Sequence, residues 1–172
     1  VTLLLKTGPV FDIKDLENIP VDLSSKRLDI KRFYSAEDLY NQMKSLISSR
    51  QYSAVVHSAA VADYAPLKQV GKIASGKNLD LQFKKTKKIA LEIKDWDPLI
   101  FLVTFKLEVS SESETSRKWR DITNIARESG VKYRSDLVVA NDLGEIRNTG
   151  EHKAVLIQGP FICLVTGKSK IA

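Results

Sequence analysis

Residues 57–66 contain the side chains best suited to chemistry. They read His-Ser-Ala-Ala-Val-Ala-Asp-Tyr-Ala-Pro and follow a valine-centred run that is typical of a buried strand. Small side chains at a strand end let a flat base or a sugar lie against the backbone, and the Asp63 carboxylate could accept hydrogen bonds from a ribose or hold a magnesium ion. The alternative is a tightly packed strand-to-loop corner with a capping aspartate. The residue types favour a nucleotide but leave that alternative open.

Several familiar catalytic signatures are absent from the sequence. The Gly167-Lys168-Ser169 run does not end a phosphate-binding loop, because Ile162 stands where such a loop needs glycine. Two histidines, His57 and His152, lie in unrelated contexts, which disfavours a histidine metal site or proton relay. The lone cysteine, Cys163, can form neither a disulfide within the chain nor a cysteine-rich metal site, and its apolar surroundings predict a core position. Hydrolase and dinucleotide motifs are missing too.

The charge balance favours a small anionic ligand over nucleic acid. The 172-residue chain has 27 lysines and arginines against 21 acidic residues, a net charge of +6, and these residues are spread along the whole sequence. A nucleic-acid-binding module remains an alternative through the basic run at residues 84–88. No apolar run approaches the roughly 18 residues of a membrane span, so we expect a cytoplasmic protein that binds neither nucleic acid nor membrane.

The elements that must position residues 57–66 alternate between strand and helix. A serine-x-x-acid capping box at residues 35–38 and an apolar stripe predict a helix over about 36–50. A second helix is predicted over 87–94, and a third carries Trp119, Ile122, Ile125 and Ala126 on one face with Gly130 as its C-terminal cap. Strands are predicted at residues 1–5, 28–30, 53–60, 79–83, 100–105 and 136–140, followed by an antiparallel hairpin at 154–157 and 161–165.

Three of the predicted strands end in polar or small residues. These ends are residues 57–63, 105–108 and 141–142. Strand, helix and strand following one another favour parallel pairing, and ligands of open α/β sheets bind at the carboxyl ends of the strands. The three clusters are therefore expected to share one cleft.

These segments resemble, in order along the chain, the phosphopantothenoylcysteine synthetase family, the ligase half of a bifunctional bacterial coenzyme A enzyme. The first is the Ala-Val-Ala-Asp-Tyr-x-Pro signature ending at Pro66, followed by a lysine-bearing mobile loop at 72–76 and a strand-then-threonine segment at 79–89. The others are 94–98, the strand end Thr-Phe-Lys-Leu-Glu at 104–108, and 136–142, which contains Val-Ala-Asn-Asp. Two departures are Lys87 in place of proline and Thr104 in place of glycine.

The resemblance implies a Rossmann-like three-layer α/β sandwich with a mainly parallel sheet and a C-terminal antiparallel hairpin. We expect residues 1–172 to form a single nucleotide-binding ligase domain, without the family's first strand, its glycine-rich loop and its last helix. The missing loop contacts the phosphopantothenate in family members, so we expect residues 1–172 alone to be catalytically impaired.

The family's reaction joins 4'-phosphopantothenate to cysteine through an acyl-nucleotide intermediate, an acid–amino acid ligation that forms a C–N bond. The implied co-substrate is CTP, with ATP as the alternative, together with Mg2+; the implied assembly is a homodimer. The alternative hypothesis is that this chain is a non-catalytic relative of the family that binds nucleotide.

The resemblance also assigns roles to individual residues. Ala59, Ala60, Val61 and Asp63 would contact the nucleotide, Asp63 also holding the magnesium-nucleotide, and Phe105 would pack beside the base or ribose. Lys72 would bind the triphosphate as a catalytic lysine, and Lys132 would reach phosphate as a second one, unless it is simply a surface lysine after a helix. Asn141 would mark the strand end that faces the substrate in the cleft, in a structural rather than a catalytic role. Lys106 and Asp142 could be either structural or functional.

Overall fold

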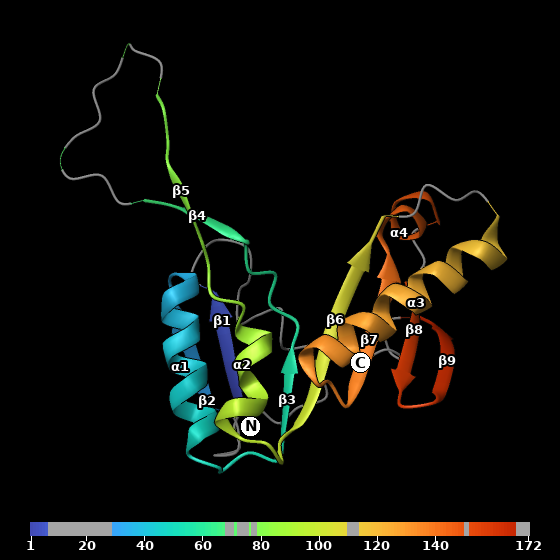
Figure 1. Ribbon diagram of the computed structural model, residues 1–172, viewed down its shortest axis with the longest axis horizontal. Helices are drawn as coiled ribbons and strands as arrows, with labels where there is room; N and C mark the ends of the chain where they lie inside the picture. Colours follow the sequence, from blue (N-terminus) through green and yellow to red (C-terminus); the bar gives the residue numbers. More distant parts are fainter. Residues whose placement is uncertain are drawn as a thin grey trace. The chain divides into compact units, whose positions relative to one another are not determined.

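The computed structural model describes residues 1–6, 29–67, 71, 76, 79–109, 114–149 and 152–167 (Figure 1). They fall into two compact units, each treated by itself. Unit 1 is Val1–Ser45 with Val61–Lys87, and unit 2 is Leu46–Ala60 with Lys88–Ala172. That residues 1–172 form a single domain stays a prediction.

Unit 1 contains a parallel strand pair and most of the first helix. Strands β1 (Thr2–Lys6) and β2 (Asp29–Phe33) pair in parallel, and α1 (Ala36–Ser48) follows β2. One half of the predicted capping box forms, because the Asp38 N–H donates to Ser35 Oγ at 3.1 Å; the Asp38 carboxylate accepts instead from the N–H of Tyr34, one residue before the cap, at 2.9 Å. The helix predicted over 36–50 is therefore confirmed, although it ends two residues earlier.

A short antiparallel ribbon is the other part of unit 1. It pairs β4 (Tyr64–Pro66) with β5 (Phe83–Lys85) in the register Tyr64↔Lys85 and Pro66↔Phe83. The strand predicted over 79–83 therefore begins only at Phe83, and β4 was not predicted. Three residues without a hydrophobic pattern give too weak a strand signal.

Unit 2 is built on a five-stranded sheet in the order β3-β6-β7-β8-β9. Strands β3 (Ala54–His57), β6 (Phe101–Glu108) and β7 (Leu137–Asp142) pair in parallel. Strands β8 (Lys153–Gln158) and β9 (Phe161–Thr166) continue the sheet in antiparallel fashion. The predicted parallel core and C-terminal hairpin are confirmed. A short helix, α4 (Leu143–Thr149), follows β7 and was not predicted.

Helices α2 (Ile89–Trp96) and α3 (Thr115–Tyr133) belong to the same unit, and α3 packs on the sheet (Figure 1). The core between α3 and the sheet is formed by Ile122, Ala126, Val138, Ala140, Val155 and Ile157, with Trp119 partly buried against it. Ile125 was predicted on the same face but is 38% exposed. The predicted stripe was therefore one residue too wide.

Gly130 does not end α3 as predicted. The helix continues to Tyr133, and Arg134 takes the left-handed conformation of the cap, with φ at 54°. Glycine is required at 130 for a different reason: a Cβ there would lie 2.9 Å from Val138 Cγ2 on β7. The residue allows close approach of helix and strand rather than a change of chain direction.

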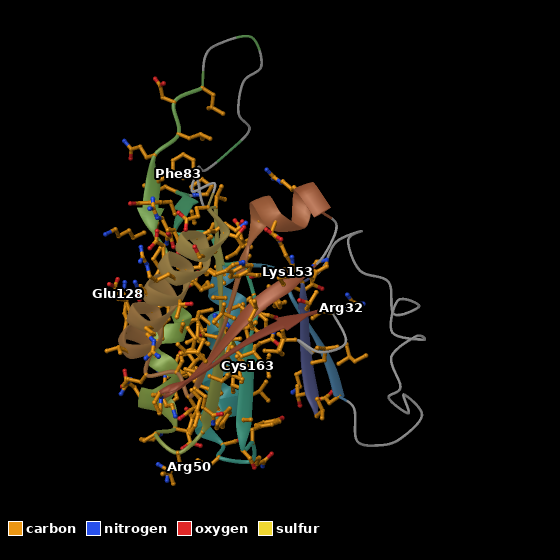
Figure 2. The ribbon with its side chains drawn as sticks, turned by 90° about the vertical axis from the view of Figure 1, so that its right-hand side faces the viewer. Arg32, Arg50, Phe83, Glu128, Lys153 and Cys163 are labelled. Carbon is orange, nitrogen blue, oxygen red and sulfur yellow. The ribbon has the colours of Figure 1, made fainter. Side chains whose placement is uncertain are left out.

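Strand β9 forms one edge of the sheet and exposes its apolar side chains. Phe161 is 76% exposed, Ile162 50% and Leu164 55%. The prediction that Cys163 lies in the core is wrong, because this side chain is exposed as well (Figure 2). An apolar run predicts burial, but an edge strand has a neighbour on one side only. Among the described residues, no helix is long and apolar enough to cross a membrane.

Candidate functional site

The parallel strands of unit 2 end at different heights. His57, the last residue of β3, pairs with Thr104, whereas β6 and β7 continue to the pair Glu108↔Asp142. Strand β3 therefore stops four residues short of the end of β6, which is roughly 13 Å of extended chain. Residues 58–60 leave the sheet beside this step. The predicted convergence of strand ends is thus a stepped edge within unit 2.

Phe105 and Asn141 lie on the same face of this stepped edge. The pairs Phe105↔Val139 and Leu107↔Asn141 make them diagonal neighbours on adjacent strands, within reach of one bound molecule. They point away from α3, because α3 packs against Val138 and Ala140, which alternate with them along β7. Phe105 is 40% exposed and Asn141 is half-buried. An exposed aromatic ring beside an amide suits a flat polar ligand.

The alanine-rich segment divides between the two units. Ala59 and Ala60 follow β3 in unit 2 and are exposed. Val61, half-buried, and Asp63, exposed, belong to unit 1. The backbone carbonyl of Asp63 accepts a hydrogen bond from the Thr86 N–H at 2.9 Å, at the base of the β4–β5 ribbon. Lys72 lies outside the described residues. Unit 2 therefore brings Ala59, Ala60, Phe105 and Asn141 to one edge.

Lys132 lies at the other end of unit 2. It is in the last turn of α3, fourteen residues after Lys118, or roughly 21 Å along the helix axis. Lys118 contacts the end of β7, whereas Asp136, just after Lys132, donates its N–H to the Leu102 carbonyl near the start of β6. The structure does not bring Lys132 together with Phe105 and Asn141, and its phosphate-binding role stays a prediction without support from this placement.

A buried ionic network holds the end of β7. Asp142 is 1% exposed, and Lys118 Nζ lies 2.8 Å from its Oδ2 and 2.6 Å from Glu145 Oε2. Lys153 Nζ contacts the other oxygen of Glu145 at 2.9 Å. The Asp142 carboxylate also accepts hydrogen bonds from the N–H groups of Gly144 and Glu145, which caps α4. Asp142 is therefore structural in this chain.

The sequence contained a signal for this network. Asp142-Leu143-Gly144-Glu145 matches the acid-x-x-glutamate spacing of a helix start, which predicts α4 and its cap. Nothing in the sequence indicates that Lys118, on a different element, completes the network. Lys106, the other residue left open, pairs with Glu108 at 2.7 Å on the α3 side of β6.

The network shifts two pKa values in opposite directions. Hydrogen bonds to Asp142 and Glu145 raise the pKa of Lys118, and hydrogen bonds from Lys118 and Lys153 lower the pKa of Glu145. Burial lowers the pKa of His57, which faces the side of the sheet opposite to Phe105.

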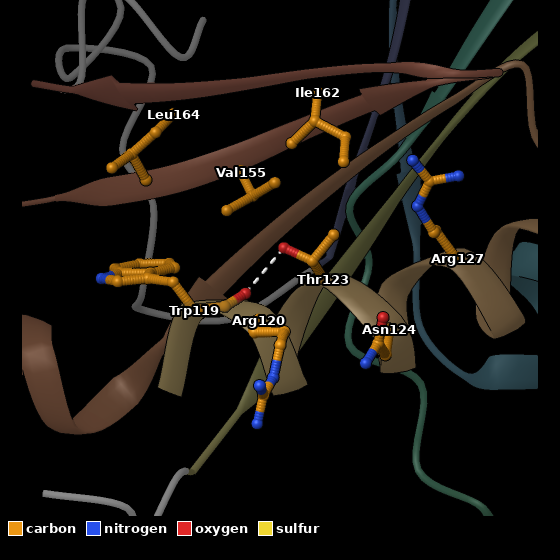
Figure 3. A pocket seen from close by; sticks show the side chains of 8 residues that line it. All are labelled: Trp119, Arg120, Thr123, Asn124, Arg127, Val155, Ile162 and Leu164. Atoms are coloured by element: carbon orange, nitrogen blue, oxygen red, sulfur yellow. Dashed lines mark hydrogen bonds between the residues drawn. The ribbon is translucent and has the colours of Figure 1, made fainter. Parts of the chain in front are cut away.

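A shallow groove of about 380 Å³ lies elsewhere in unit 2, between α3 and the β8–β9 hairpin (Figure 3). Its apolar floor is Val155, Ile162 and Leu164, and α3 contributes Trp119, Arg120, Thr123, Asn124 and Arg127. The Thr123 hydroxyl donates to the Trp119 carbonyl at 2.6 Å, so it does not point to a ligand. The groove is on the opposite face of the sheet from Phe105. It is therefore separate from the stepped edge.

Metal-binding side chains do not gather in the described parts of the chain. Across those residues, no three His, Cys, Asp or Glu side chains are arranged to hold a metal ion. Asp63 offers a single exposed carboxylate, which fits a magnesium ion carried mainly by a nucleotide's phosphates but not a metal site made by protein alone.

The parallel core, its stepped carboxyl edge and the antiparallel hairpin define a Rossmann-like α/β fold, as the sequence predicted. The chain belongs to the DNA/pantothenate metabolism flavoprotein C-terminal domain family, whose profile matches residues 18–159. A solved structure of the DNA/pantothenate metabolism flavoprotein from Streptococcus pneumoniae is 25% identical, with a TM-score of 0.75 over 99% of this chain and 76% of that one.

The chain is also similar to parts of longer curated proteins. The chain is 32% identical over 128 residues to the coenzyme A biosynthesis bifunctional protein CoaBC of Thermococcus kodakarensis, covering 74% of this chain and 30% of the relative. A solved Cab2 mutant in complex with phosphopantothenate-cysteine shares the fold, at 14% identity and a TM-score of 0.61 over 86% of this chain and 49% of that one. The match to the Thermococcus kodakarensis protein thus spans about a third of that relative's length.

The ionic network predicts an acid-dependent loss of stability. Because the pKa of Glu145 is lowered in the fold, its contribution is present above the ordinary value of 4.5 and is lost as pH falls through the lowered value. We expect Glu145→Gln to lower the free energy of unfolding by about 1–2 kcal/mol at pH 7 and by much less near pH 3, measured by urea unfolding. The raised pKa of Lys118 preserves its contribution below 10.5.

The control for this prediction is Glu128→Gln, an exposed glutamate of α3. Its effect should be within about 0.5 kcal/mol at both pH values. A Glu145→Gln effect of the same size at pH 7 and pH 3 would contradict the assignment of the lowered pKa to the folded state.

Proposed function

We propose that this protein ligates 4'-phosphopantothenate to cysteine through an acyl-nucleotide intermediate, as a ligase of coenzyme A biosynthesis. The observation that carries the proposal is the family match over residues 18–159 together with the stepped edge that holds Phe105 and Asn141. The name of the Thermococcus kodakarensis relative supports a role in coenzyme A biosynthesis, and the phosphopantothenate-cysteine bound to the Cab2 mutant supports the two substrates. The chain covers only part of those proteins, so the whole reaction is a proposal for this one.

The stepped edge of the sheet is a suitable binding site for the nucleotide. Ala59 and Ala60 carry no side chain beyond Cβ, so a base or ribose can approach the backbone beside β6. Phe105 follows Thr104, the partner of the last residue of β3, and its side chain is 40% exposed, enough for one face of the ring to stack. Val61 and Asp63 continue the same segment, and we assign them contacts with the ribose and the magnesium-nucleotide.

The proposed reaction depends on cancelling negative charge. A carboxylate that attacks an α-phosphate brings two anions together, so catalysis must come from cations and N–H groups arranged before the reaction. We assign this role to Lys72, which lies between β4 and β5 in the sequence. Asn141, on the exposed face of β7, is assigned to the acid substrate through its amide.

The identity of the nucleotide is also a proposal. We favour CTP over ATP because of the Ala-Val-Ala-Asp spelling of residues 60–63, which resembles the bacterial form of the family. Magnesium would accompany the triphosphate, neutralise part of its charge and use Asp63 as its carboxylate contact.

A second copy of this chain is the proposed partner for the edge strand β9. Three of its apolar side chains are at least half exposed, and its outer backbone groups have no strand beside them in the described sheet. A homodimer would cover this edge. Light scattering at micromolar concentration tests it, and a stable monomer would exclude it.

The reaction is tested by measuring pyrophosphate. With the full-length natural protein, CTP, magnesium and cysteine, we expect pyrophosphate release only when 4'-phosphopantothenate is present, because acyl activation precedes attack by the amine. Replacing CTP with ATP in the same assay identifies the nucleotide. Release that does not depend on the acid would indicate a different reaction, and binding without release would indicate a non-catalytic relative.

The same assay tests Lys72. Lys72→Ala should lower the rate of pyrophosphate release by roughly 100- to 1000-fold, the usual effect of removing one preorganised group that stabilises charge in the transition state. Lys77→Ala is the matched control for a general loss of positive charge. Equal effects of the two changes would mean that this segment attracts anions only diffusely.

Phe105 offers a test with a control on its own strand. Phe101 lies four residues earlier on the same face of β6 and is 37% exposed, against 40% for Phe105. We expect Phe105→Ala to weaken nucleotide binding by about tenfold, the value of one stacking contact, and Phe101→Ala to change it less than twofold. Isothermal titration with CTP measures both. Equal losses would place the nucleotide elsewhere.

A further inference from the structure

The base of the β4–β5 ribbon is fixed by one residue, Thr86. Directly after the last pair of the ribbon, Tyr64↔Lys85, the Thr86 N–H donates to the Asp63 carbonyl at 2.9 Å. The Thr86 hydroxyl donates to the carbonyl of the preceding residue, Ala62, at 2.5 Å. One residue thus binds two successive carbonyls of the alanine-rich segment.

The ribbon needs such a fixed base because it is short. Each strand has three residues, and two-stranded ribbons of this length are marginally stable in water. The side chains of Tyr64 and Phe83 on it are more than half exposed, so packing adds little. At its far end, the described residues contribute one further backbone bond, from the Leu67 N–H to the Gln82 carbonyl at 2.8 Å. The two bonds of Thr86 are therefore a large share of what closes the ribbon.

The next residue, Lys87, connects the same base to α1. Lys87 Nζ lies 4.0 Å from the centre of the Tyr40 ring, a cation–π contact with α1, and Tyr40 is only 7% exposed. The base is thus held both to the alanine-rich segment and to a buried side chain of α1. The ribbon extends from a fixed point within unit 1.

We propose that Thr86 is a positioning residue for the ligase reaction: its hydroxyl fixes the backbone at Ala62 and Asp63 relative to the base of the β4–β5 ribbon, and so places the Asp63 carboxylate. This inference rests on the proposed function. The hydroxyl acts through the Ala62 carbonyl and does not contact the substrates. Its loss lets the Asp63 carboxylate move relative to the ribbon, so nucleotide binding weakens.

Folding stability should hardly depend on this hydroxyl. Ala62 is exposed, so its carbonyl can bond to water once the hydroxyl is removed. Valine keeps the β-branched shape of threonine and its backbone N–H, so the bond to Asp63 can still form. Thr86→Val therefore isolates the single bond to Ala62, and Thr86→Ser restores it without the methyl group.

The test compares these variants in the full-length natural protein. We expect Thr86→Val to raise the KM for the nucleotide about five- to tenfold, to leave the KM for cysteine within twofold, and to speed hydrogen exchange of the residue 86 amide at least fivefold. Thr86→Ser should stay within about twofold of the unmutated protein in all three. Thr123→Val, which removes a helical hydroxyl that bonds to the Trp119 carbonyl, is the matched control and should change neither KM.

Each other outcome has a definite meaning. An active Thr86→Val protein with an unchanged nucleotide KM overturns the inference and leaves the proposed function intact. A Thr86→Ser protein as impaired as Thr86→Val also overturns it, because the methyl group rather than the hydroxyl would then matter. If the unmutated protein releases no pyrophosphate with 4'-phosphopantothenate and cysteine, the proposed function fails, and this inference fails with it.

Discussion

The buried carboxylate of Asp142 is the interaction on which the carboxyl edge of unit 2 depends. A charge that is 1% exposed must be paired, and here it is paired with Lys118 and with two N–H groups at the start of α4. The pairing joins the first turn of α3, the end of β7 and α4. Because β7 is held to its last residue, β6 can pair with it as far as Glu108, well beyond the end of β3.

The difference in strand length creates the candidate site. Where β3 stops, the last residues of β6 and β7 form a step that exposes one face of Phe105 and part of Asn141. The small residues at 59 and 60 leave space beside it. The buried network stands on the α3 side of the sheet and the proposed nucleotide seat on the other, so one face provides rigidity while the opposite face provides contacts.

Unit 1 contributes a different kind of support. Its ribbon is short and exposed, and its geometry depends on a few hydrogen bonds at the base rather than on a packed core. The position of the ribbon therefore depends on the hydrogen bonds that Thr86 makes at its base. The two hydrogen bonds of Thr86 are the counterpart, in unit 1, of the ionic network in unit 2.

The sequence by itself determined the alternation of strands and helices, the capping box of α1, the parallel core and the family motifs, because each is written in residues close together along the chain. It also contained the cap of α4. Tertiary structure alone decided the position of Lys132 away from Phe105, the close approach that requires Gly130, the exposure of Cys163 and the pairing of Lys118 with Asp142. These depend on strand order, register and helix direction, which join residues distant in sequence and leave no local pattern.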